Sequence, residues 1–77
     1  MTASPVDLEP VAAAARQALA RTVYTWLHRV VVLVEADRLV LRGDVPSYYL
    51  KQLAQVTVMA VPGVPGLRNE LRVIDGA

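Results

Sequence analysis

One continuous run, residues 38–73, constrains the fold more than any other part of the chain. It contains, in order, a short strand pattern, a glycine, a helix pattern, a Pro-Gly pair and a second strand pattern. Each local signal agrees with the next, which is typical of a sequence that specifies a single structure. The run indicates a fold, but it contains no pattern typical of a reaction centre.

The two strand patterns of this run follow a period of two residues. Leu39 and Leu41 share one face of a strand over residues 39–42, which Gly43 ends. The closing segment, residues 67–74, also alternates and predicts a half-buried strand. One side of that strand has Leu67, Asn69, Leu71 and Val73, and the other has Arg68, Glu70, Arg72 and Ile74.

The helix between these strands has a start signal and a stop signal. We expect Ser47 to be its N-cap, because the hydroxyl can accept a hydrogen bond from an amide that has no partner inside the helix. Pro62 and Gly63 predict its end. The face predicted to contact the sheet comprises Leu50, Leu53, Ala54, Thr57 and Val61.

The first part of the chain predicts another helix. Residues 1–7 have no periodicity and are interpreted as a disordered tail before a single domain over residues 8–75. Asp7 or Glu9 can cap the helix, and Pro10 suits its first turn. The predicted apolar face comprises Leu8, Val11, Ala12, Ala15, Leu19, Val23 and Trp26.

A β-branched run, residues 29–35, predicts the first strand, and residues 36–38 predict a tight hairpin turn without the usual glycine. The predicted order is therefore helix, strand, strand, helix, strand. This αββαβ order predicts an α+β fold in which a three-stranded sheet has both helices packed on one face. The other face is then open, and the order of the strands in the sheet is left undetermined.

Composition excludes several classes of protein. A chain of 77 residues makes one domain that buries roughly 60% of its unfolded surface. The absence of cysteine excludes disulfides and thiolate metal sites. A net charge of +1 argues against nucleic-acid binding, and the G-x-x-G at residues 63–66 is interpreted as a helix stop and turn.

The sequence also bears on location. Residues 1–10 lack the basic and apolar parts of a secretory signal. The longest uncharged stretch, residues 52–67, is interrupted by two prolines and is shorter than the roughly 20 residues that a membrane span requires. We therefore expect a cytoplasmic protein, with membrane association left open.

Catalysis finds little support. His28 is the only histidine, and it is interpreted as a solvated residue on the outer side of the first helix. Ser47 is better explained as a helix cap than as a nucleophile. The acidic residues are scattered singly, so no carboxylate pair or metal cluster is predicted. We expect no enzyme activity, no catalytic residue, no cofactor and no metal.

Two surfaces are candidates for binding. The outward side of the second helix has little charge for a solvent-facing surface, so it is either a tolerated apolar surface or a site for a partner or a lipid headgroup. Its candidate ligand-binding residues are Tyr48, Lys51, Gln52, Gln55 and Met59. The open sheet face is the second candidate, an apolar patch with arginines around it. Its candidate interface residues are Val31, Leu33, Val40, Arg42, Arg68 and Arg72.

The chain resembles a BON domain, a small αββαβ module of bacterial osmotic-shock and nodulation proteins. The resemblance covers about residues 12–73. It depends on L-x-L-x-G-x-V-x-S at residues 39–47, on Ala54, and on G-V-x-x-L-x-N-x-L-x-V at residues 63–73. The family's hairpin glycine is replaced around Asp37 and Arg38. The resemblance implies binding of phospholipid or other envelope components, without catalytic residues.

These observations predict a non-catalytic binding module that associates with a phospholipid or envelope-related ligand. The alternative is a module for protein interaction or self-assembly that does not bind lipid. Self-assembly has a physical basis, because the open sheet face and a β-branched strand at a sheet edge would both leave apolar surface in water. The candidate partners are thus an anionic phospholipid surface, a second copy of the chain or a partner protein, and no nucleic acid.

Overall fold

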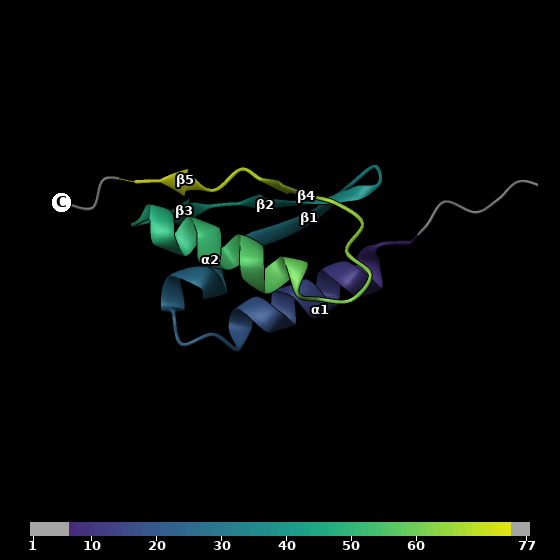
Figure 1. Ribbon diagram of the computed structural model, residues 1–77, viewed down its shortest axis with the longest axis horizontal. Helices are drawn as coiled ribbons and strands as arrows, with labels where there is room; N and C mark the ends of the chain where they lie inside the picture. The colour runs from purple at the N-terminus through teal and green to yellow at the C-terminus, as the bar shows by residue number, and fades with distance from the viewer. Residues whose placement is uncertain (1–6, 75–77) are drawn as a thin grey trace, which may run out of the picture.

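The computed structural model describes residues 7–74 and has the predicted α+β architecture (Figure 1). Its elements are α1 (Glu9–Ala20), the 3-10 helix η1 (Thr25–Arg29), β1 (Val31–Glu35), β2 (Arg38–Arg42), β3 (Asp44–Val45), α2 (Tyr48–Met59), β4 (Leu67–Asn69) and β5 (Arg72–Val73). The predicted αββαβ order is confirmed. The last predicted strand is divided into β4 and β5, and the short β3 follows β2. The predicted N-terminal tail, apart from Asp7, lies outside the described residues.

The strand β2 is the centre of the main sheet. It pairs with β1 in antiparallel orientation and with β4 in parallel orientation, and β3 pairs with β5 in a second parallel ladder. Backbone bonds join the two ladders, since the amides of Glu70 and Arg72 donate to the carbonyls of Leu41 and Gly43, each at 2.9 Å. Gly43 has a φ of +139°, a conformation that side chains disfavour, and it marks the break between β2 and β3.

Both helices lie on one side of the strands, as predicted, and the other side of the sheet has no helix on it (Figure 1). The core between the layers is entirely aliphatic. Ala12, Ala15 and Ala54 are fully buried, and their small side chains let the helices pack closely. The core cluster comprises Leu8, Ala12, Ala15, Leu19, Leu27, Val32, Leu39, Leu41, Val45, Leu50, Ala54, Val58 and Leu71.

The helix α1 begins as predicted but ends earlier. Asp7 Oδ1 accepts a hydrogen bond from the amide of Glu9 at 3.0 Å, although Leu8 occupies the N-cap position. The predicted apolar face is wrong at its end, because α1 stops at Ala20 and Val23 is 86% exposed. Trp26 lies in η1, where Leu27 is the residue that enters the core.

A local hydrogen bond helps to explain this early end. Thr22 Oγ1 donates to the carbonyl of Leu19 at 2.8 Å. Such side-chain bonds compete with the continuing helical bonds of the backbone. His28 is exposed, as predicted, but it lies on η1 and not on the outer side of the first helix, so its predicted place is wrong.

The predicted limits of α2 are close to the observed ones. The amide of Leu50 donates to Ser47 Oγ at 3.2 Å, which confirms the predicted N-cap. The helix ends at Met59, and Gly63 follows with a φ of +91°. Of the predicted inner face, Leu50 and Ala54 are buried, and Leu53, Thr57 and Val61 are half-buried. Val58, which the predicted face did not include, is fully buried.

The hairpin between β1 and β2 forms without glycine. Its closing pair is Glu35 and Arg38, and Ala36 in the turn has a φ of +53°. An alanine in this left-handed region costs roughly 1–2 kcal/mol relative to the right-handed one, so the turn stores strain.

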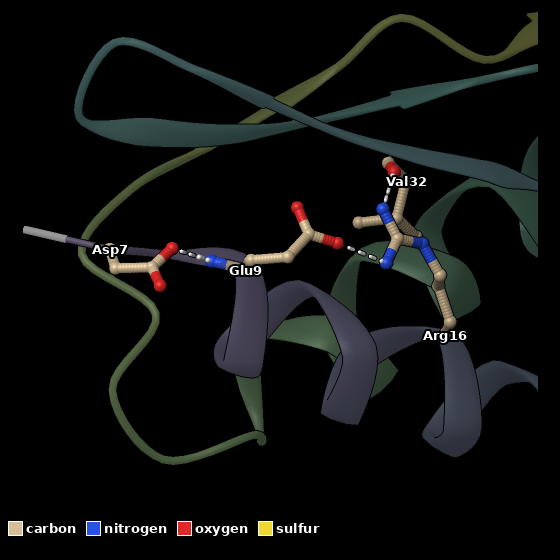
Figure 2. Close-up of polar contacts among 4 residues, drawn as sticks. All are labelled: Asp7, Glu9, Arg16 and Val32. Atoms are coloured by element: carbon tan, nitrogen blue, oxygen red, sulfur yellow. Dashed lines mark hydrogen bonds and ion pairs between the residues drawn. The ribbon is translucent and has the colours of Figure 1, made fainter.

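The strand β1 is an edge of the main sheet, and a side chain from α1 covers part of that edge. Arg16 donates through one terminal nitrogen to the carbonyl of Val32 at 2.7 Å and through the other to Glu9 Oε1 at 2.7 Å (Figure 2). The Val32 carbonyl is therefore turned away from β2 and is occupied by the guanidinium. Charged side chains at an edge oppose pairing with another chain.

Candidate functional site

A shallow cavity of about 350 Å³ lies on the outward side of α2. Its lining comes from five residues of α2 and one of β4, namely Tyr48, Lys51, Gln52, Gln55, Val56 and Asn69. We call this cavity the α2 groove. The structure thus brings together four of the five side chains predicted as a ligand site. Met59, the fifth, is exposed but is not part of the lining.

Asn69 joins the helix to the sheet at this groove. Its Nδ2 donates to the carbonyl of Lys51 at 2.9 Å and to Gln55 Oε1 at 3.3 Å. Its Oδ1 accepts from the amide of Leu71 at 3.1 Å. The Leu71 contact is a local bond between a side chain and the backbone. Its contacts with α2 span 14 and 18 residues, and no local pattern reveals them.

The groove has the chemistry of a site for an anion with an apolar part. Lys51 supplies a positive charge, while Gln52 and Gln55 supply amide donors. Tyr48 and Val56 add apolar surface. The lining contains no acidic residue, and within residues 7–74 Lys51 forms no ion pair.

The open sheet face has the predicted residues but a different character. The register pairs Val31 with Arg42, Leu33 with Val40, and Val40 with Arg68, so these five side chains share one face. The prediction that Val40 belongs to an accessible interface is wrong, because it is fully buried. Val40 is on the central strand, where its cross-strand neighbours lie on both sides of it.

The arginines of this face are paired with acids. Glu70 contacts Arg42 at 2.9 Å and Arg68 at 2.8 Å, while Arg72 lies 3.6 Å from Asp44. An acidic ligand would have to compete with these carboxylates for the guanidinium groups. The α2 groove, where the lysine is not engaged in this way, is the better site for an anion.

The side chains considered for catalysis have structural contacts. His28 Nε2 lies 2.8 Å from the carbonyl of Thr22, which fixes that nitrogen as a donor. Ser47 Oγ is the acceptor of the α2 cap. Within residues 7–74, His, Asp and Glu form no group of three that could hold a metal ion.

Tyr24 and Tyr49 meet near the start of α2 with their ring centroids 6.4 Å apart at an interplanar angle of 73°. The neighbouring Tyr49, by hydrogen bonding and by charge repulsion, raises the pKa of the Tyr24 hydroxyl, and desolvation adds to this effect. Tyr49 of this pair directly follows Tyr48, which belongs to the lining of the α2 groove.

Comparison with protein-family models matches the BON domain over residues 7–75, nearly the whole chain. A search of curated proteins and a search of solved structures each found no significant match. In the part of the chain that the structure describes, no helix has the length and apolar character to cross a membrane.

Proposed function

Since the chain belongs to the BON domain family, whose members are generally non-catalytic binding domains, we propose that it binds anionic phospholipid headgroups. The binding site in this proposal is the α2 groove. The observation that carries the proposal is the convergence of Lys51, two glutamine amides and an apolar rim in one cavity without an acidic residue. A phosphate headgroup suits the lysine and the amides, and the adjoining acyl chain suits Tyr48 and Val56.

The expected affinity is low. A basic side chain near an anionic membrane contributes about 1 kcal/mol, and each hydrogen bond contributes roughly 0.5–1.5 kcal/mol net. Lys51 with two amide bonds then supplies about 2–4 kcal/mol, which corresponds to a Kd near or above about 1 mM for one lipid. Binding is therefore best measured with vesicles at millimolar lipid, where many headgroups are available.

Co-sedimentation with vesicles tests the proposal. The protein should sediment with phosphatidylglycerol vesicles at low ionic strength, and it should do so less at high salt because exposed charges are screened. It should remain in solution with pure phosphatidylcholine. Absence of sedimentation with anionic vesicles at low salt would contradict the proposal.

A pair of charge-reversal variants locates the site. Lys51→Glu should weaken sedimentation, whereas Arg38→Glu, which changes the net charge equally on the hairpin, should have much less effect. Circular dichroism checks that both variants are folded. Equal losses in the two variants would mean that net charge, and not the α2 groove, determines binding.

A further inference from the structure

All four aromatic residues of this chain are on its surface. The sequence contains one tryptophan, three tyrosines and no phenylalanine. Trp26 and Tyr24 are each 36% exposed, Tyr48 is 59% exposed and Tyr49 is 61% exposed. The core is aliphatic, so none of these rings is needed to fill it. Exposed aromatic rings that gather in one place usually mark an interaction surface.

The rings come from two segments that lie together at one end of the molecule. Trp26 belongs to η1, and Tyr24 is the residue before it. Tyr48 and Tyr49 are the first two residues of α2. The contact between Tyr24 and Tyr49 joins the two segments. Figure 1 shows η1 beside the first turns of α2, at the end opposite to the β1–β2 hairpin. We call these four residues the aromatic end.

The distribution of ion pairs distinguishes this end from the rest of the surface. Within residues 7–74, Arg16, Arg38, Arg42, Arg68 and Arg72 each have an acidic partner. The other three cations, Arg21, Arg29 and Lys51, have none among these residues. Lys51 belongs to α2. Arg21 and Arg29 belong to residues 21–29, the segment that also contains Tyr24 and Trp26. The guanidinium of Arg29 lies 5.8 Å from the ring centroid of Trp26.

Aromatic rings together with cations that lack acidic partners match the surface of an anionic bilayer. Trp and Tyr favour the headgroup level of a membrane, because their rings are amphipathic, and basic side chains are attracted to anionic lipids. A protein partner of similar chemistry would need an acidic and apolar surface of its own. The bilayer has both properties at once.

From these observations we infer that the aromatic end is the part of the domain that enters the headgroup layer. This inference rests on the proposed lipid binding and adds an orientation to it. Trp26 and the three tyrosines lie among the headgroups, Arg29 and Lys51 face the lipid phosphates, and the β1–β2 hairpin is directed away from the bilayer.

Trp26 reports on this orientation directly, because it is the only tryptophan. With phosphatidylglycerol vesicles at low salt, its emission should shift to shorter wavelength, and lipids brominated near the headgroup should quench it. A polarity-sensitive dye on Asp37→Cys, in a chain without other cysteines, should show no such shift.

The outcomes separate the orientation from the proposed function. Co-sedimentation without a change in Trp26 emission, or with a shift of the Asp37→Cys dye, would overturn the orientation and leave lipid binding intact. Absence of co-sedimentation would overturn both. A shift of Trp26 that depends on protein concentration without vesicles would also overturn the orientation, because it would show the aromatic end in contact with a second copy.

Substitutions give an independent test. Trp26→Ala and Tyr49→Ser should each reduce partition into anionic vesicles about tenfold. Because Tyr49→Ser also removes the ring contact with Tyr24, its Tm should fall by a few degrees, and partition is measured at a temperature where circular dichroism shows both variants folded. Val34→Ala is the matched control, because Val34 is 39% exposed but lies on β1 near the hairpin. Loss of partition in Val34→Ala equal to that in Trp26→Ala would contradict the inference.

Discussion

Asn69 should stabilise the domain substantially, because its half-buried side chain connects α2 with the strands. Asn69→Ala removes the hydrogen bonds to the Lys51 carbonyl and to the Leu71 amide. It also removes the longer bond to Gln55 Oε1. The amide of Leu71 then loses its side-chain hydrogen-bond partner. This loss is costly because Leu71 is buried.

The magnitude follows from these contacts. Each of the two shorter bonds contributes about 1 kcal/mol net, and an amide left without a partner can raise the cost further. We expect Asn69→Ala to lower the free energy of unfolding by about 2–3 kcal/mol. For a domain of this size, 1 kcal/mol corresponds to roughly 4–8 °C, so the Tm should fall by about 10–20 °C.

Urea unfolding followed by far-UV circular dichroism measures this loss. Gln55→Ala is the control, because it removes only the 3.3 Å bond and should cost less than about 0.5 kcal/mol. Asn69→Asp keeps the acceptor for Leu71 but places an oxygen against the Lys51 carbonyl, so it should lose as much as Asn69→Ala. If Asn69→Ala unfolded like the parent, or if Gln55→Ala lost as much, the assigned role of Asn69 would be refuted.

Three further predictions concern the sheet. Leu41→Ala should cost about 2–5 kcal/mol in urea unfolding because Leu41 is fully buried, and a parent-like midpoint would contradict the core assignment. Ala36→Gly should raise stability by about 0.5–1 kcal/mol, since glycine adopts the positive φ of the turn without strain, and a lower Tm would refute this. Arg16→Ala should increase self-association in sedimentation velocity, because it uncovers the Val32 carbonyl at the β1 edge, whereas an unchanged monomer would argue against this protection.

Predictions from local pattern were accurate where the cause is local. The Ser47 cap, the stop near Gly63 and the alternation of the strands depend on residues a few positions apart. The predicted groove residues are also local in origin, because Tyr48, Lys51, Gln52 and Gln55 fall on one side of a single helix.

Predictions failed where the cause is distant or where a boundary has no strong signal. The end of α1 has no glycine or proline to mark it, so the helical period predicts a helix that continues to Trp26. Asn69 enters the groove because β4 pairs with β2 and lies against α2, which depends on contacts between distant segments.

The sequence by itself determined the order of the elements, the alternation of the strands, the cap of α2 and the absence of cysteine chemistry, because each depends on composition or on neighbouring residues. Only the tertiary structure decided that β2 is the central strand, and with it the burial of Val40 and the pairing of the arginines with Glu70. It also brought Tyr24, the residue before η1, beside Tyr49 at the start of α2. The physical reason is that these arrangements are selected by packing of the whole core, in which segments far apart in the sequence compete for the same buried surface.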